Sequence, residues 1–117
     1  CADYEPESAF GLGRRLRAVI DRAGEPVGVL VVADGATTLT AAAPGGHDPA
    51  ASAMQAALDD ALAAGDVAAL AAVSTDVVGR VAYQVLAGLA EPGPRSAREL
   101  VRGAPYGVGY FVGVWSP

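Results

Sequence analysis

The sequence predicts an α/β domain in which helices lie on the faces of a mixed sheet. Three observations lead to this class: an apolar, β-branched run at Val27–Ala33, helical apolar spacing on either side of it, and a segment of alternating small and large residues at Val108–Trp115. The 117 residues are 52% hydrophobic, which suits one folded domain over residues 1–117. Only three strands are expected, fewer than such a sheet usually has, so we expect this chain to be one part of a larger domain.

A first helix is predicted from Pro6 onward. Proline suits the first turn of a helix, Gly24 can end it in a left-handed cap, and Pro26 prevents its continuation. Arg17 and Asp21 form an i, i+4 pair on its surface. One apolar face has helical spacing: Leu12, Leu16, Val19, Ile20 and Ala23. The pattern predicts an amphipathic helix laid on a sheet.

The run V-G-V-L-V-V-A at Val27–Ala33 is typical of a strand buried on both faces, so we place it centrally in the sheet. A long loop, residues 34–46, leaves its carboxyl end. Because open α/β sheets bind ligands at the carboxyl ends of their strands, Asp34 is the first residue to consider for chemistry. Its alternative interpretation is an ordinary residue of an Asp-Gly turn.

Three more helices are predicted after the loop. Asp48 and Pro49 suit the start of the first, and Gly65 its end. Asp66 and Ser74 resemble the N-caps of the second and third helices. The first buries Met54, Ala57, Leu58, Ala61 and Leu62; the third buries Val78, Val81, Ala82, Val85, Leu86 and Leu89 and ends at residues 91–94.

Two strands are expected to end the chain, at Arg98–Arg102 and Val108–Trp115, joined by a turn. Glycine weakens a strand, so Gly107, Gly109 and Gly113 are each expected at a bulge or at a close approach of another group.

Composition excludes several classes of protein. The net charge of −5 argues against a nucleic-acid partner, which requires a basic surface. No run approaches the ~20 apolar residues of a membrane span. A lone cysteine cannot form an intrachain disulfide and fits a reducing compartment, so we expect a cytoplasmic protein.

Few residues could carry catalysis. His47 is the only histidine and Cys1 the only cysteine, so this chain cannot build a zinc cluster or a two-histidine iron site. His47 also fits an ordinary loop residue before a helix. Asp59 and Asp60 are adjacent on a helix and are expected to face solvent. Cys1 could act as a nucleophile with its own α-amine as base, which would make the chain an N-terminal-cysteine hydrolase subunit produced by self-cleavage.

Three motifs carry a resemblance to a known family: A-D-G-A-T-T-L at 33–39, A-P-G-G-H-D at 43–48 and A-P-Y-G-V-G-Y at 104–110. In order and spacing they are similar to the C-terminal part of the class III extradiol ring-cleavage dioxygenase catalytic subunits (LigB-like, including Memo-like proteins). That family has Gly-Asp-Leu-Ser-His-Arg after a buried strand, then Ala-Pro-x-Gly-x-Asp, and ends with Pro-(Phe/Tyr)-Gly-Val-Gly-Tyr. The chain looks like a divergent branch.

The resemblance implies a larger three-layer α/β domain and an oxidoreductase. Family members bind non-haem iron through two histidines and a carboxylate, and a further histidine acts as acid and base. That histidine falls at Thr37, which cannot relay a proton near neutral pH, and the iron-binding histidines belong to the preceding half of the fold. The resemblance therefore implies a non-catalytic protein or an altered substrate. The implied pocket is lined by Asp34, Gly35, Thr37, Thr38, Tyr106, Gly107 and Tyr110.

The expected partner is the preceding half of the same domain or a second chain, and a homo-oligomer is a further possibility, since missing strands leave an apolar edge. A small binding or structural module remains the alternative to both enzyme classes.

Overall fold

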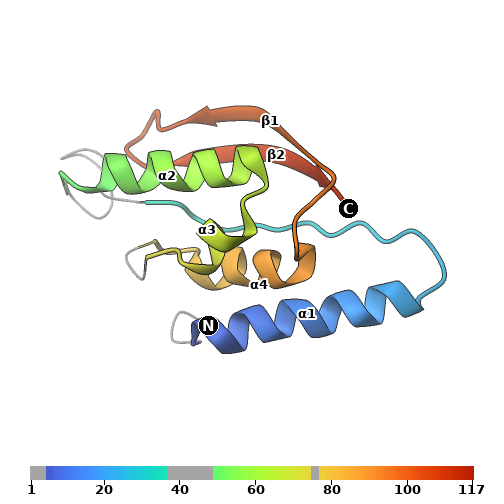
Figure 1. Ribbon diagram of the computed structural model, residues 1–117. Coiled ribbons are helices and arrows are strands. Elements are labelled where there is room, and N and C mark those ends of the chain that lie inside the picture. The colour runs from blue at the N-terminus through green and yellow to red at the C-terminus, as the bar shows by residue number, and fades with distance from the viewer. Residues whose placement is uncertain (1–4, 37–48, 75–76) are drawn as a thin grey trace.

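The computed structural model describes residues 5–36, 49–74 and 77–117, in which helices accompany a two-stranded antiparallel sheet, so the α/β class is confirmed. Its elements are α1 (Pro6–Arg22), α2 (Ala51–Ala64), α3 (Val67–Ala71), α4 (Arg80–Ala90), β1 (Ser96–Gly103) and β2 (Tyr110–Ser116). In Figure 1 the β1–β2 hairpin and α2 lie at one end, α1 lies at the other, and α4 lies between them. No helix in the described ranges is both long and apolar enough to cross a membrane.

Helix α1 has the predicted bounds but not the predicted buried face. Pro6 occupies its first turn and Gly24 follows its end with a φ of 74°. The expected apolar face is largely in solvent, with Val19 57% exposed, and the residues that α1 buries are Ala9 and Gly13. The helix packs along α4 and not on a sheet. Small residues face the contact because they allow the two backbones to approach closely.

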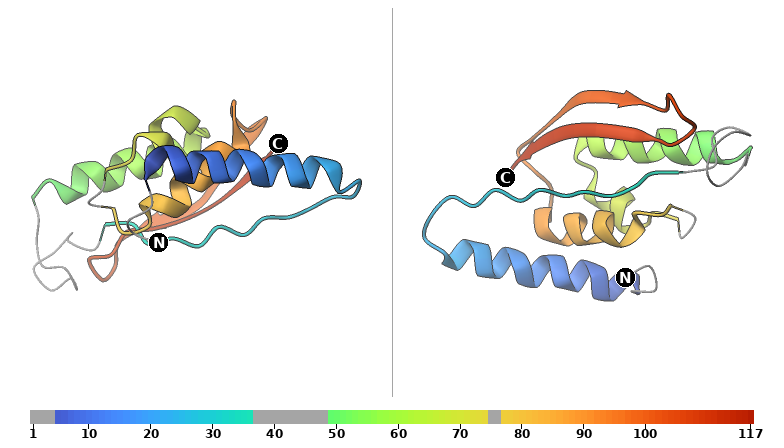
Figure 2. Two further views of the ribbon diagram at one scale, coloured as in Figure 1. Left: turned by 90° about the horizontal axis from the view of Figure 1, so that it is seen from below. Right: turned by 180° about the vertical axis from the view of Figure 1, so that it is seen from behind.

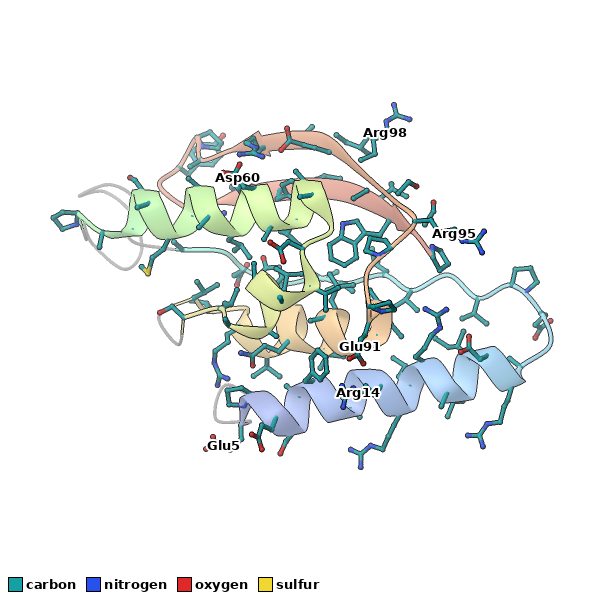
Figure 3. The ribbon with its side chains drawn as sticks, in the orientation of Figure 1. Glu5, Arg14, Asp60, Glu91, Arg95 and Arg98 are labelled. Atoms are coloured by element: carbon teal, nitrogen blue, oxygen red, sulfur yellow. The ribbon has the colours of Figure 1, made fainter. Side chains whose placement is uncertain are left out.

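Glycines make the contact between α1 and α4. A Cβ at Gly13 would overlap the carbonyl oxygen of Val85, and one at Gly88 would overlap that of Phe10. A bidentate ion pair extends the contact, since Arg14 Nε and Nη2 donate to the two carboxylate oxygens of Glu91 at 2.7 Å each (Figure 3). This pair raises the pKa of Arg14 and lowers that of Glu91.

The predicted central strand at Val27–Ala33 is extended but belongs to no sheet in the described structure. It crosses the molecule between α4 and the hairpin (Figure 2). The prediction that both of its faces are buried is wrong for this chain: Leu30 is 87% exposed and Val32 is 81% exposed. A strand is buried on both faces only when neighbouring strands and covering layers surround it, and the described residues provide neither on its outer side.

The helices after the loop follow the predicted caps at Gly65 and Asp66, but the predicted starts of α2 and α4 are wrong. Gly65 ends α2 with a φ of 68°, and the Asp66 side chain caps α3 by accepting from Ala69 N at 3.1 Å. Helix α2 begins at Ala51 after Ala50, so Pro49 does not occupy its first position, and α4 begins at Arg80 after Gly79 and not at Ser74. The residues that α4 buries also differ from the predicted face, because α4 packs against both α1 and α3; they are Arg80, Tyr83, Gln84, Ala87, Gly88 and Leu89. The proposed N-cap Asp48 lies outside the described residues.

The sheet is a two-stranded antiparallel hairpin, so the predicted mixed sheet is not present in the described part of the chain. Both strands were predicted within a few residues of their bounds. Ser96 pairs with Ser116, and the register shifts between Glu99 and Val101. Helix α2 covers the hairpin, and Trp115 Nε1 donates to Leu62 O at 2.7 Å to fasten them. A core around Leu58, Leu62, Leu70, Val77, Tyr83 and Ala87 joins α2, α3 and α4.

Candidate functional site

The first and last sequence motifs meet at one place in the fold. Gly109 N, just before β2, donates to Ala36 O at 3.0 Å, and Ala36 follows the extended segment. Helix α2 runs past this contact and contributes Gln55 and Asp59. We call these residues, together with Gly35, the Ala36 junction: Gly35, Ala36, Gln55, Asp59 and Gly109.

Gln55 connects the parts of the junction. Its Oε1 accepts from Ala36 N at 2.8 Å, and its Nε2 donates to Asp59 Oδ1 at 2.8 Å. Only glycine leaves room for this side chain on the two neighbouring segments, because a Cβ at Gly35 or at Gly109 would overlap the Gln55 carboxamide. The prediction of a close approach at Gly109 is thereby confirmed, and the approaching group is Gln55.

Asp59 is buried, at 6% exposure, which corrects the expectation that it faces solvent. Burial raises the pKa of Asp59, while the hydrogen bond from Gln55 and the charge of Arg102 oppose that shift, and Glu99 and Asp60 reinforce it. The neighbouring Asp60 does face solvent, where its carboxylate accepts from Arg102 Nη1 at 2.8 Å. The adjacent carboxylates therefore have different environments.

Sequence reasoning missed Gln55 and Asp59, although a signal for both was present. Gln55, Leu58, Asp59 and Leu62 have the i, i+3, i+4, i+7 spacing of one helix face, and all four are buried. Polar residues on a face that also carries leucines belong to a hydrogen-bonded network when that face is buried.

The raised pKa of Asp59 predicts that stability falls as pH rises. The folded state binds the Asp59 proton more tightly than the unfolded state does, so this contribution is fully present below the unfolded pKa and is lost as pH rises through the folded pKa. Asp59→Asn removes the titrating group and is expected to flatten this part of the pH profile. Urea unfolding from about pH 3 to pH 8 measures it. The matched control is Asp60→Asn; an equal flattening by the control would contradict the assignment to Asp59.

The residues that the sequence predicted for the pocket differ in burial, and some of them lie outside the described ranges. The Asp34 side chain is exposed, and its carbonyl oxygen accepts from Gly79 N at 2.8 Å. Gly107 is buried with a φ of 74°, whereas Tyr106 is 77% exposed and Tyr110 is 49% exposed. Residues Cys1, Thr37, Thr38 and His47 lie outside the described residues. The structure therefore brings the two motifs together through their backbones and leaves both tyrosines at the surface.

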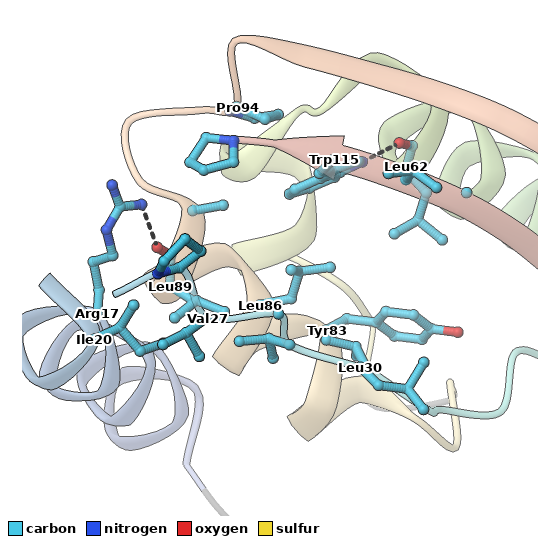
Figure 4. Close-up of a pocket in the computed structure, with 18 of the residues that line it drawn as sticks. Arg17, Ile20, Val27, Leu30, Leu62, Tyr83, Leu86, Leu89, Pro94 and Trp115 are labelled. Atoms are coloured by element: carbon cyan, nitrogen blue, oxygen red, sulfur yellow. Dashed lines mark hydrogen bonds between the residues drawn. The ribbon is translucent and has the colours of Figure 1, made fainter. Parts of the chain in front are cut away.

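A cavity of about 1030 Å³ lies between the extended segment, α1, α4 and β2 (Figure 4), and no residue of the Ala36 junction lines it. Its walls are mainly apolar and include Val29, Leu86, Phe111 and Trp115. Two of its aromatic residues carry a polar group, and both groups are already bonded: Tyr83 Oη donates to Ala33 O at 3.2 Å, and Trp115 Nε1 donates to Leu62 O. Burial, with the charges of Asp59 and Asp34, raises the pKa of Tyr83 to about 12. The side chains of the cavity wall therefore offer mainly apolar contact.

The described residues do not fit the iron centre that the family resemblance implies. Across ranges 5–36, 49–74 and 77–117, no three histidine, cysteine or acidic side chains lie close enough together to hold a metal ion. The buried carboxylate of Asp59 is bonded to Gln55. The described ranges contain no histidine that could bind a metal ion together with it. No catalytic step through iron is derived for this chain.

Fold and site together define an α/β unit in which an extended apolar segment is held at a helix–hairpin junction. Comparison with protein-family models, with curated proteins and with solved structures found no match to this chain.

Proposed function

We propose that this chain is the C-terminal part of a class III extradiol dioxygenase (LigB)-like protein and that it has no ring-cleaving activity of its own. The observation that carries the proposal is the bond from Gly109 N to Ala36 O, together with Gln55. It joins the first and last of the three family-like motifs, which are about 70 residues apart in the sequence. Such convergence is what a shared pocket edge requires.

Two features support the lack of activity. Thr37 stands where the family has its acid–base histidine, and threonine does not exchange protons near neutral pH. The described ranges also contain no histidine, and their carboxylates form no cluster that could hold a metal ion. An altered substrate is the form that any retained activity would take.

The extended segment supports membership of a larger domain. Val27–Ala33 has the composition of an internal strand, yet it stands alone in the described structure. We propose that the preceding half of the same domain, or a second chain, completes the sheet; a homo-oligomer is one form that the second case could take. The proposed location is the cytoplasm, since a lone cysteine fits a reducing compartment.

Oxygen uptake tests the proposed lack of activity. The purified chain, incubated with Fe²⁺ and a catechol in an oxygen electrode, is expected to consume oxygen no faster than the same solution without protein. Metal analysis after desalting is expected to find far less than one iron per chain. Iron-dependent uptake above the blank, or stoichiometric iron, would contradict the proposal.

An experimental structure of the full natural gene product tests the family part of the proposal. The expected result is a larger sheet in which Val27–Ala33 is hydrogen-bonded on both sides while the Ala36–Gln55 bond is kept. If the segment remains unpaired in the complete protein, the proposed LigB-like architecture fails.

A further inference from the structure

We propose that Val27–Ala33 is an acceptor edge for an added β-strand, and that the strand it binds has an uncharged, β-branched centre and basic ends. This goes beyond the proposed function, because it requires only the free edge described below and not membership of any family.

The backbone of the segment is extended and available. Within the described structure, no residue from Val27 to Val32 forms a hydrogen bond. The segment is nevertheless held in place where it ends: Tyr83 Oη donates to Ala33 O at 3.2 Å, and Gly79 N donates to Asp34 O at 2.8 Å. An extended backbone with free N–H and C=O groups is a template for strand pairing, and its anchoring lowers the entropy cost of binding.

The side chains show what kind of strand fits. Leu30 and Val32 are 87% and 81% exposed, while Val27 and Val29 are each 46% exposed. The cavity of about 1030 Å³ beside the segment has mainly apolar walls, which suit the alternate side chains of an added apolar strand (Figure 4). A strand with a charged centre would leave its charge facing this apolar surface without a partner.

The hairpin shows by contrast how an edge is protected. Strand β1 carries Arg98, Glu99 and Arg102 and has an irregular register after Glu99. Charged side chains and bulges are the devices that prevent pairing at sheet edges. Val27–Ala33 carries no charged residue and no proline, so the chain leaves this edge open to a partner strand.

The charges at the two ends of the segment favour a different polypeptide over a second copy. Glu25 and Asp34 flank it, both side chains are exposed, and neither forms an ion pair in the described structure. Antiparallel pairing of two copies centred between Val29 and Leu30 would bring Glu25 of one copy opposite Asp34 of the other, and like charges at a pairing site oppose association. A strand with arginine or lysine at its ends places opposite charges there.

A synthetic peptide tests the proposal. The probe is fluorescein-labelled Arg-Val-Thr-Val-Thr-Val-Arg, titrated with the full chain and followed by fluorescence anisotropy. Saturable binding is expected, with increased protection of the amides of residues 27–32 in hydrogen exchange. The same peptide N-methylated at alternate residues loses one edge of backbone donors, and its affinity is expected to fall more than about tenfold.

Two matched variants locate the site. Leu30→Lys is expected to weaken binding more than about tenfold, whereas Val101→Lys adds the same charge to β1 and is expected to leave it unchanged. Both residues are exposed, and circular dichroism verifies that each variant folds. Equal affinity for the N-methylated peptide, or equal loss in both variants, overturns the proposal. The proposal is also overturned if the wild-type chain does not bind the peptide but forms dimers that Leu30→Lys disrupts, because a second copy would then be the occupant.

Discussion

Gly88→Ala is expected to lower the free energy of unfolding by about 3 kcal/mol. The new methyl group would overlap the carbonyl oxygen of Phe10 on α1. Two helix backbones in direct contact cannot yield as a flexible side chain does, so the helices must move apart and lose the packing around Ala9 and Gly13. The loss exceeds the gain of about 1 kcal/mol that alanine brings to a helix interior.

Helix α1, on the other side of this contact, offers a control for the Gly88 prediction. A Cβ at Gly11 of α1 would meet nothing within 4 Å, so Gly11→Ala is expected to be neutral or to stabilise by up to about 1 kcal/mol. Urea unfolding at equilibrium measures both variants, and unchanged m values would show that the change lies in stability. If the two variants shifted the midpoint alike, the close crossing of α1 and α4 would not exist in solution.

Gln55→Leu is expected to cost about 2–4 kcal/mol, because it leaves two buried groups without their partner. Ala36 N would lose its acceptor and the Asp59 carboxylate its donor, while leucine fills nearly the same space. Removal of the Gln55 hydrogen bond also removes a contribution that lowers the pKa of Asp59, so the stability of this variant is expected to fall more steeply with rising pH than that of the wild type.

A double-mutant cycle separates the two lost contacts. Asp59→Asn in the Gln55→Leu background removes the uncompensated charge, so the double variant is expected to be more stable near neutral pH than Gln55→Leu alone. Asp60→Asn is the control on the same helix, since its exposed carboxylate has no bond to Gln55, and it should recover nothing. Additive effects of Gln55→Leu and Asp59→Asn would mean that their hydrogen bond contributes no coupling energy.

The caps and turns of the fold were predictable because their causes lie within a few residues. Pro6 presets the first turn of α1, Gly65 takes the left-handed conformation that ends α2, and Asp66 accepts from an amide three residues later. Each effect needs only neighbouring backbone groups. The start of α4 was mispredicted at Ser74, because serine also occurs at many positions that do not begin a helix. The residue that precedes α4 is Gly79, whose N–H donates to the carbonyl oxygen of Asp34, far away in the sequence.

Burial was less predictable, because apolar spacing identifies a face without saying what covers it. The spaced leucines of α1 suggested a helix on a sheet, but α1 meets α4 through Ala9 and Gly13. The same limitation applies to Val27–Ala33. Its composition requires neighbours on both sides, and the described chain does not provide them.

By itself, the sequence determined the α/β class, the start of α1, the end of α2, the cap of α3, the end of α4 and the hairpin. The shared pocket of the first and last motifs stays a prediction from the family resemblance. Only the tertiary structure decided that Gln55 joins them and that Asp59 is buried while Asp60 is not. The physical reason is the range of the interactions: propensities and caps act between near neighbours, whereas the Ala36 junction requires segments separated by long stretches of chain to meet at hydrogen-bonding distance.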